Sequence, residues 1–398
     1  MNSIEWRATA GLALVYTLRM MGLFMVLPVF APYAGQLSGG ATPQQVGLAL
    51  GVYGLTQAIL QLPLGWLSDR VGRKPIILVG MAVFAAGSWL SSSADTIEWL
   101  IVGRALQGAG AISSAVSALL ADVTRAQVRT QAMTLMGAGM GGAFVLALII
   151  GPPVAGMIGV DGIFAGAGWL ALLTVPILIF MVPKAPRLSG TRGRVRDVIR
   201  DGRLLRIDGG IFLLHAAMTA TFLMLPSAIG EAMHLDQAAQ WEVYLPVMLL
   251  SLFLVFPIIR IAEKRGLQRS AMVGAILALA SALLILGFAE HHPAVLVGAL
   301  GLFFIGFNYL EGALPSLISR IAPADNKGAA LGVYATSQFL GAFVGGAVIG
   351  GNAMDWLGMH GFAVVALLPL IWLSFVSGIP VVPRHEAPVE AEPAASQR

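Results

Sequence analysis

The stretch of sequence that decides the fold is GWLSDRVGRK, which runs from Gly65 to Lys74. Charged side chains crowd into its second half, although only 11% of the residues in the whole chain are charged. Long apolar runs lie on both sides of it, at 46–64 and at 75–90. A short charged turn between two apolar runs of bilayer length predicts a tight loop at a membrane surface.

The composition of the chain agrees with a membrane protein. Of its 398 residues, 57% are hydrophobic and 11% are charged. A soluble domain carries about 25% charged residues. The absence of cysteine excludes disulfides and cysteine metal sites. The first apolar run, from Ala8 to about Tyr33, exceeds the core of a signal peptide and predicts a retained helix. The sequence therefore predicts an all-α polytopic membrane protein.

Apolar segments of about 20 residues divide the chain into twelve expected transmembrane helices. They are 8–34, 44–67, 75–94, 97–124, 129–158, 162–182, 209–230, 240–261, 269–289, 293–320, 327–353 and 360–381. We expect two six-helix halves, at 1–182 and 209–382, and a disordered Pro-, Ala- and Glu-rich tail at 383–398.

A cytoplasmic linker is expected between the halves, at 183–208. Within it Val195, Val198, Ile199 and Leu205 recur at helical spacing among arginines. This pattern predicts an amphipathic helix on the inner leaflet, and a solvated flexible linker is the alternative.

The charged residues of the loops separate by sign. Lys and Arg gather in every second connection, whereas the connections between them carry acidic residues such as Asp95, Asp161 and Asp355. The positive-inside rule then places both termini in the cytoplasm. The basic residues behind the net charge of +4 thus set the orientation of the helices in the membrane, and they are expected to contact anionic membrane lipid. We expect no nucleic-acid partner, because no folded domain presents a basic face.

The two halves also repeat one another weakly. The segment 24–28 (FMVLP) matches 222–226 (FLMLP), and the charged loop has an eroded copy at 261–266. Transporters commonly consist of such duplicated halves, with the substrate site between them near the membrane midplane.

Several motifs resemble those of the major facilitator superfamily. The pattern at 65–74 resembles its signature loop between the second and third helices, and 104–110 (RALQGAG) resembles its Arg-x-x-Gln-Gly-x-Gly motif. The segments 19–28 and 52–57 are similar to the YajR subgroup of bacterial drug:proton antiporter-like facilitators. The resemblance implies the twelve-helix fold of that superfamily, with two pseudo-symmetric halves, in a bacterial inner membrane.

A further motif resembles one linked to antiporters. Gly151, Pro152 and Gly156 fit its Gly-Pro-x-x-Gly-Gly pattern, but Ala147 and Ala155 stand where glycines are expected. Alanine is also small, so close packing is still expected at both positions. The replacement of the two glycines weakens the antiporter assignment.

The resemblance also implies a cytoplasmic gate. Its residues are Gly65, Asp69, Arg70, Gly72, Arg73, Lys74 and Asp122. Gly72 allows the tight reversal of the chain, and Asp69 is expected beside the N-terminus of the helix at 327–353. Arg73 is expected to pair with Asp122 while the gate is shut. The alternative is that the basic residues serve only as positive-inside anchors.

Four ionisable residues fall within apolar runs: Arg19, Arg104, His215 and Glu311. A charged Arg or acidic residue costs about 2.5–3.5 kcal/mol at the centre of a membrane helix, so each is expected to face a cavity or a partner. The resemblance implies that the four helices that carry them line a central cavity.

Glu311 is the leading candidate for the proton-coupling site. It lies about nine residues from Arg320, near the middle of the bilayer. His215, which titrates near neutral pH by default, is expected to share its proton, and Arg104 to modulate either group. The alternatives are a permanent ion pair between Glu311 and Arg19, a packing role for His215, and an anion contact for Arg19.

Four neutral polar residues are candidates for the substrate cavity: Gln57, Gln61, Gln107 and Asn308. Hydrogen bonds across helices are the alternative role for them. The glycine-rich run at 137–142 has no preceding strand, so it indicates helix packing and not nucleotide binding. We see no motif for metal binding or for nucleophilic catalysis, and expect no enzyme and no cofactor beyond the coupling proton.

These observations predict a proton-coupled secondary transporter that works by alternating access. Export of small amphipathic or drug-like molecules by proton antiport is the first expectation. Proton symport or facilitated uptake of a small nutrient, including an anionic one, is the alternative, and a non-transporting membrane sensor or scaffold is a third. A monomer is the default oligomeric state for this fold.

Overall fold

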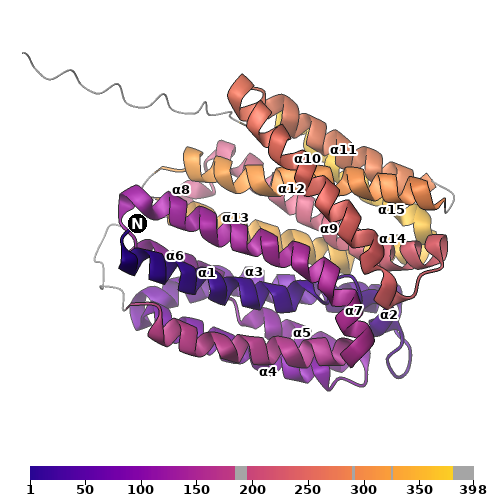
Figure 1. Cartoon of the computed structure of the whole chain (residues 1–398), viewed down its shortest axis with the longest axis horizontal. Coiled ribbons are helices and arrows are strands. Elements are labelled where there is room, and N and C mark those ends of the chain that lie inside the picture. Colours follow the sequence, from indigo (N-terminus) through magenta and orange to yellow (C-terminus); the bar gives the residue numbers. More distant parts are fainter. Residues whose placement is uncertain (184–194, 289–291, 324–325, 380–398) are drawn as a thin grey trace, which may run out of the picture.

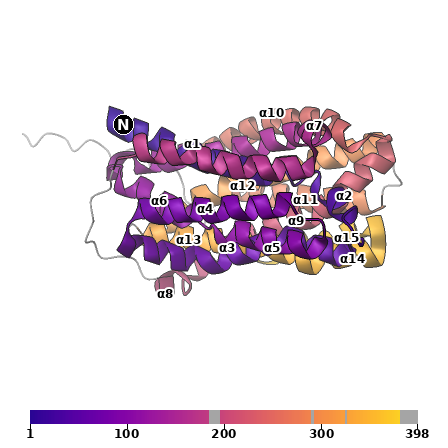
Figure 2. The ribbon, with the colours of Figure 1, turned by 90° about the horizontal axis from the view of Figure 1, so that it is seen from below.

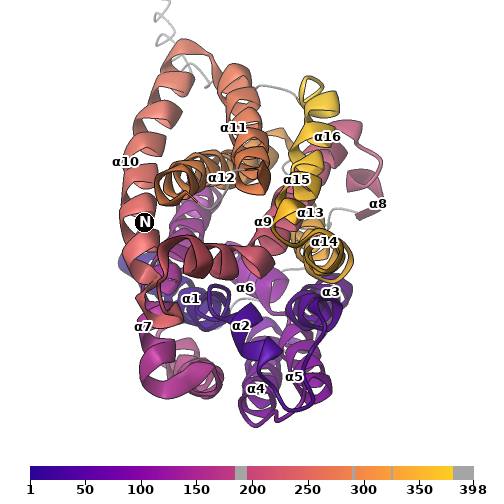
Figure 3. The ribbon, with the colours of Figure 1, turned by 90° about the vertical axis from the view of Figure 1, so that its right-hand side faces the viewer.

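The computed structural model describes residues 1–183, 195–288, 292–323 and 326–379. All regular structure in these residues is helical. Figures 1 and 3 show two bundles side by side, one made by α1–α7 and the other by α9–α16. In Figure 2 most of the helices again run along the long axis of the molecule.

The first bundle is built from seven helices. They are α1 (Ser3–Phe24), α2 (Phe30–Gly35), α3 (Pro43–Val71), α4 (Arg73–Ser92), α5 (Ile97–Ala109), α6 (Ser113–Asp122) and α7 (Ala126–Phe180). The pairs α1 with α2 and α5 with α6 each correspond to one expected membrane helix with a break in it. The long α7 contains two expected helices, which meet at Gly159, where the backbone leaves helical geometry with φ 75°.

The second bundle follows a short α8 (Val195–Val198). Its elements are α9 (Gly202–Met233), η1 (Gln237–Ala239), α10 (Trp241–Arg265), α11 (Gln268–Phe288), α12 (Pro293–Ile321), α13 (Lys327–Phe343), the π-helical η3 (Val344–Gly350), α14 (Gly351–Leu357), η4 (Gly358–His360), α15 (Gly361–Val365) and α16 (Leu367–Val376). The segment from α13 to α14 is one expected helix, and α15 with α16 is another.

Hydropathy and length agree with this arrangement. Eight helical stretches of the described chain are long and apolar enough to span a membrane. Two of them, Gln127–Phe180 and Lys327–Val376, are long enough to span it twice. The other expected spans are divided into the shorter pieces α1 with α2 and α5 with α6.

The linker differs from the sequence expectation in one respect. Within its described part, only α8 is a separate helix, and α9 already begins at Gly202 instead of at 209. Asp201 caps α9 by accepting a hydrogen bond from the backbone of Arg203, and Leu204 and Ile207 are buried. The arginines hid this helical turn from the hydropathy pattern. The expected tail at 383–398 lies outside the described residues.

The two ends of the molecule differ in charge. Arg73, Arg125 and Arg203 lie at helix ends on the side of the N-terminus, which we call the basic end. Asp95 and Asp355 lie at the other end, near α2 and α14, which we call the acidic end.

The two bundles meet most closely where α3 crosses α13, η3 and α14. A Cβ atom added to Gly47 would lie 2.3 Å from the Gly346 carbonyl oxygen, and one added to Gly54 would lie 2.4 Å from that of Phe339. Only glycine allows backbones to approach this closely.

Hydrogen bonds reinforce this closure at the acidic end. The side chain of Gln44 donates to Asp355, and that of Gln237 donates to the Val29 carbonyl. Both hydrogen bonds join the two bundles. The structure is therefore closed at its acidic end.

A Gly47→Ala substitution should open the acidic end. The added methyl group meets the backbone of the other bundle only in the closed arrangement, and such overpacking costs about 1–3 kcal/mol. Spin labels are attached at Ser38→Cys and Leu357→Cys, and the distances between them are measured by double electron–electron resonance. We expect Gly47→Ala to show a larger share of long distances than the parent. The chain has no native cysteine to interfere with labelling.

Gly137→Ala is the matched control, because nothing lies within 4 Å of the position of its Cβ atom. Equal distance distributions for Gly47→Ala, the control and the parent would show that this contact does not hold the acidic end closed.

Candidate functional site

The charged loop between α3 and α4 forms a compact cluster at the basic end. Gly72 has φ 117°, which reverses the chain directly after α3. Arg73 forms ion pairs with Asp69 and with Asp122, the latter at 3.0 Å between Nε and Oδ2. It also donates to the Ser68 hydroxyl at 2.7 Å. Arg73 and Asp122 were expected to pair while the gate at this end is shut. The pair is present in a structure that is closed at the opposite, acidic end, and it joins α3, α4 and α6 within one bundle.

The other residues of the loop have different contacts. The Arg70 guanidinium lies 3.8 Å from the ring centroid of Trp66, and Lys74 donates to the Val182 carbonyl beyond the end of α7. A Cβ atom on Gly65 would lie 2.9 Å from the Ser114 hydroxyl. The whole loop is thus held against α6 and α7, and the gating role of these residues stays a prediction.

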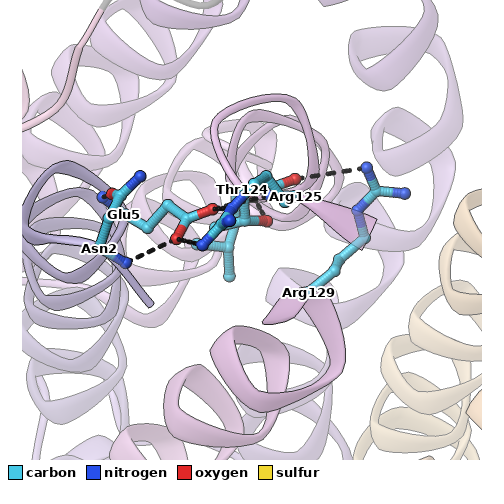
Figure 4. Close-up of polar contacts among 6 residues, drawn as sticks. Asn2, Glu5, Thr124, Arg125 and Arg129 are labelled. Carbon is cyan, nitrogen blue, oxygen red and sulfur yellow. Dashed lines mark hydrogen bonds and ion pairs between the residues drawn. The ribbon is translucent and has the colours of Figure 1, made fainter. Parts of the chain in front are cut away.

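A second ion pair at the basic end was not expected from the sequence (Figure 4). Glu5, in the first turn of α1, accepts from Arg125 Nε at 2.8 Å and from its Nη2 at 3.1 Å. Asn2 and Glu5 also form a reciprocal capping box at the start of α1. The contact ties the first helix to the connection between α6 and α7. The Asn-x-x-Glu pattern at residues 2–5 was the signal for the capping box, and no local pattern indicated the pair with Arg125.

The environment of Glu5 favours its charged form. Its side chain is buried, and Arg125 hydrogen bonds, followed by the backbone N–H of Asn2, lower the pKa of Glu5 to about 2. Arg125 also donates its backbone N–H to the same carboxylate at 3.1 Å. Nearby, Arg129 donates to the Thr124 carbonyl at 3.4 Å, which covers the connection from the side of α7.

Arg19 lies in the interior of the first bundle. It donates to Gln57 Oε1 at 2.8 Å, to the Tyr53 hydroxyl at 3.1 Å and to the Gly110 carbonyl at 3.1 Å. Gly110 stands at the break between α5 and α6, where helical hydrogen bonds are missing, so Arg19 satisfies a carbonyl that the break leaves free. Its Nε and Nη1 atoms are buried without a hydrogen-bond partner.

Arg104 occupies a similar position closer to the acidic end. It donates to Gln107 Oε1 at 2.7 Å and lies 5.0 Å from the ring centroid of Tyr53. Gln107 in turn donates to the Ser88 hydroxyl at 2.8 Å. Both arginines are thus held by neutral groups of their own bundle.

Glu311 and His215 come together in the second bundle, with a third residue between them. Gln338 Nε2, on α13, lies 2.8 Å from His215 Nε2 and 3.4 Å from Glu311 Oε1. His215 Nε2 and Glu311 Oε2 are 3.8 Å apart. The carboxylate of Glu311 is 20% exposed. The alternative of a permanent pair between Glu311 and Arg19 is wrong, since the two residues bind different partners in different bundles.

Gln338 was missed in the sequence, although a signal for it was present. The pattern GVYATSQ at 332–338 in α13 repeats GVYGLTQ at 51–57 in α3. In each helix the glutamine side chain lies in hydrogen-bonding distance of a buried ionisable residue, Arg19 for Gln57 and Glu311 for Gln338. A search for repeats between these two helices would have found the position.

The remaining cavity candidates have mixed surroundings. Asn308 donates to the Ser251 hydroxyl at 3.0 Å across α12 and α10, and Gln57 donates to Ser113 at 3.3 Å. Gln61 is buried, and its Oε1 atom has no hydrogen-bond partner. Bonds across helices therefore account for Gln57, Gln107 and Asn308, and Gln61 alone is left without such an explanation.

Aromatic rings connect the two bundles beside the Glu311 cluster. The ring of Phe144 in α7 lies 5.5 Å from that of Phe307 in α12 and 6.5 Å from that of Phe222 in α9. Phe307 also lies 6.1 Å from the His215 ring. The polar cluster thus borders an apolar, aromatic layer at the interface of the bundles.

The antiporter-like motif of α7 allows close packing. A Cβ atom on Gly151 would lie 2.6 Å from the Met25 carbonyl oxygen, and one on Gly156 would lie 2.6 Å from Ala238 Cβ in the other bundle. Pro152 is buried beside Gly151 within α7.

Comparison with known sequences identifies the family. A sequence model described as Major Facilitator Superfamily matches residues 12–346 and 207–396. The chain is 42% identical over 379 residues to the inner membrane transport protein YajR of Escherichia coli, covering 94% of this chain and 83% of that protein. It is also 26% identical over 373 residues to the multidrug resistance protein MdtH of Aeromonas hydrophila, covering 91% and 90% of the two chains.

Solved structures share the fold at lower sequence identity. A bacterial homologue of the human lysosomal transporter Spinster aligns with a TM-score of 0.75 at 14% identity, over 95% of this chain and 96% of that one. The human organic anion transporter MFSD10 aligns with a TM-score of 0.70 at 17% identity, over 94% of this chain and all of that one.

Glu5→Gln should destabilise the protein near neutral pH and much less in acid. The folded-state pKa of about 2 lies below the ordinary value of 4.5, so the carboxylate stabilises the folded protein above the ordinary pKa. That contribution is lost as the pH falls through the folded pKa. We expect a lower unfolding temperature for Glu5→Gln at pH 7 in detergent, and a smaller difference from the parent at pH 3.

Glu98→Gln controls for the loss of a carboxylate elsewhere, since this residue is exposed in the first turn of α5. A deficit for Glu5→Gln that is the same at both pH values would show that the carboxylate charge is not the stabilising feature.

Proposed function

Because this chain belongs to the Major Facilitator Superfamily, whose members are transporters and not enzymes, we propose that it is a proton-coupled antiporter that exports small amphipathic or drug-like molecules. It is a multi-pass membrane protein, and we place it in the bacterial inner membrane with both termini in the cytoplasm. The proposal comprises a proton site, a substrate surface and a conformational cycle.

The arrangement of Glu311, His215 and Gln338 is the observation that carries the proposal. Glu311 is held by an amide and an imidazole and has no Lys or Arg partner among the described residues. A buried carboxyl group without a fixed cation can exist in protonated form, whereas one that is paired to an arginine stays ionised. Such a group can bind and release a proton as its exposure to water changes.

The substrate surface follows from the aromatic layer beside this cluster. Phe144, Phe222 and Phe307 come from both bundles and contact one another through Phe144, and Phe307 lies against His215. Aromatic faces bind apolar and cationic groups, and the carboxylate of Glu311 supplies a negative charge at the edge of the layer. A cationic amphipathic molecule and a proton would thus compete for the same carboxylate, which is the basis of antiport. The names of the relatives, a transport protein and a multidrug resistance protein, agree with this direction.

The closed acidic end supports alternating access. If the basic end faces the cytoplasm, the acidic end faces the periplasm, and the structure is closed to the periplasm by the glycine contacts of α3 with η3. Opening to the periplasm requires the two bundles to separate there and to approach at the basic end. The cluster of Arg73, Asp69 and Asp122 lies at that end within the first bundle, and we expect it to brace α3, α4 and α6 as the surface that the second bundle approaches.

Uptake of an anionic nutrient is a second candidate, favoured by one observation. Arg19 has two buried donor atoms without partners, and no described carboxylate pairs with it. An anionic substrate group would satisfy them. Arg19 is fully buried among Tyr53, Gln57 and Gly110, however, so its place inside the first bundle ranks this candidate below antiport.

Proton release on substrate binding tests the proposal. We expect purified protein in weakly buffered detergent solution to release protons when tetraphenylphosphonium or ethidium is added, and Glu311→Gln to lose this release. Glu242→Gln, at an exposed position in α10, is the control and should behave like the parent. Binding of ethidium is measured separately by its fluorescence.

Each other result changes the proposal in a definite way. Unchanged release from Glu311→Gln would move the proton site away from Glu311. Dye binding without any proton release from the parent protein would contradict antiport and favour uptake or uncoupled transport.

A further inference from the structure

We propose that Asp208 and Tyr334 form a second protonation site, between Glu311 and the basic end, through which the coupling proton exchanges with water on that side. The inference rests on the proposed function, because it extends the path of the same proton. No sequence motif pointed to it, since Asp208 was expected in the linker.

Asp208 is a buried carboxyl group without a partner. It lies in α9, it is 3% exposed, and neither of its oxygen atoms has a hydrogen-bond partner. An isolated carboxylate is strongly disfavoured in such a place, whereas a protonated carboxyl is tolerated. A group in this setting changes its charge only when water or a proton carrier reaches it, which is the property of a relay site.

The helix geometry aligns Asp208 with the Glu311 cluster. Asp208 precedes His215 by seven residues, so the two lie on the same face of α9, about two turns or ~10.5 Å apart. Asp208 is the one closer to the basic end. Along this face α9 packs directly against α13: a Cβ atom on Gly341 would lie 2.2 Å from the Phe212 carbonyl oxygen.

Tyr334 connects the two acidic residues. It lies on α13, one turn before Gln338 on the side of the basic end. Its side chain is 6% exposed, and its hydroxyl is buried without a hydrogen-bond partner. Because α13 packs along α9, the hydroxyl lies on the helix pair that also carries Asp208 and His215. The order along the helices toward the basic end is therefore Glu311 with Gln338, then Tyr334, then Asp208.

The groups that surround Asp208 leave it free to titrate. On α9, Arg206 is exposed and donates to the Gly378 carbonyl, and His215 faces Gln338. On α16, the Trp372 ring packs on Gly210, and its indole N–H has no partner. The charged residues of α8, which are Arg196 and Asp197, are exposed. Among the described residues, none forms an ion pair with Asp208.

The transfer itself is a balanced proton relay. No hydrogen bond joins the three groups directly, so protonated Glu311 gives its proton through bridging water to the Tyr334 hydroxyl oxygen, as that hydroxyl gives its own proton through water to the Asp208 carboxylate. Asp208 then releases the proton to water at the basic end, and the tyrosine is left unchanged. Buried polar clusters commonly hold water molecules, and such water would carry the proton across the gaps between these groups.

Two measurements on the full-length protein in detergent test the site without any substrate. Infrared difference spectra after a pH change report the carbonyl stretch of each protonated carboxyl group, and stopped-flow mixing with a pH dye reports the rate of proton exchange. We expect Asp208→Asn to remove one carbonyl band, to keep the band that Glu311→Gln removes, and to slow exchange at Glu311 about 10²-fold. Tyr334→Phe should keep both bands and also slow the exchange.

Asp197→Asn is the matched control, because it makes the same change at an exposed position in α8. It should leave the bands and the rate unchanged. Asp208→Asn should also unfold at no lower temperature than the parent, since its carboxyl group has no partner to lose.

The outcomes separate this inference from the proposed function. An unchanged band in Asp208→Asn, a parental exchange rate in either variant, or a large loss of thermal stability would overturn the relay and leave the role of Glu311 intact. A missing Glu311 band in the parent would overturn the proposed function and, with it, the relay.

Discussion

Polar groups that leave water for the interior of a membrane must find partners inside the protein, and most of this structure follows from that constraint. The break between α5 and α6 frees backbone carbonyls, and Arg19 donates to the one at Gly110. Arg104 is satisfied by Gln107 and by the Ala49 carbonyl. Glu311 Oε2 and Asp208 are buried without a hydrogen-bond partner, and the proton movement proposed for them would account for these exceptions.

The two bundles use the same residue pattern, 51–57 in α3 and 332–338 in α13, around buried groups of opposite charge. In α3, Tyr53 and Gln57 both accept hydrogen bonds from Arg19 and so surround a cation. In α13, Tyr334 and Gln338 stand at the corresponding positions, and Gln338 lies beside the carboxyl group of Glu311. The arginine is fully hidden, whereas the carboxylate is partly exposed. The first bundle thus fixes its charge, and the second leaves its charge able to change.

Much of the fold could be predicted from the sequence, because long apolar runs and the segregation of charged loops are properties of single segments. The pair between Arg73 and Asp122 was predictable through the motif that contains Arg73. Gln338 and Asp208 were missed for physical reasons. A neutral amide in a membrane helix carries no obvious signal, and the arginines around Asp208 disguised the first turns of α9 as a linker. Which side chains face each other across helices depends on rotations that hydropathy does not determine.

The glycine contacts between α3 and η3 have a consequence for the kinetics of the molecule. Backbones that touch without intervening side chains attract one another only at short range, and a gap of 0.5–1 Å already loses about a quarter to a half of the dispersion energy. No long side chain at Gly47, Gly54 or Gly346 can bridge a partly separated interface. Half-open arrangements are therefore poorly stabilised, and the acidic end should change between open and closed in one cooperative step, without a populated intermediate.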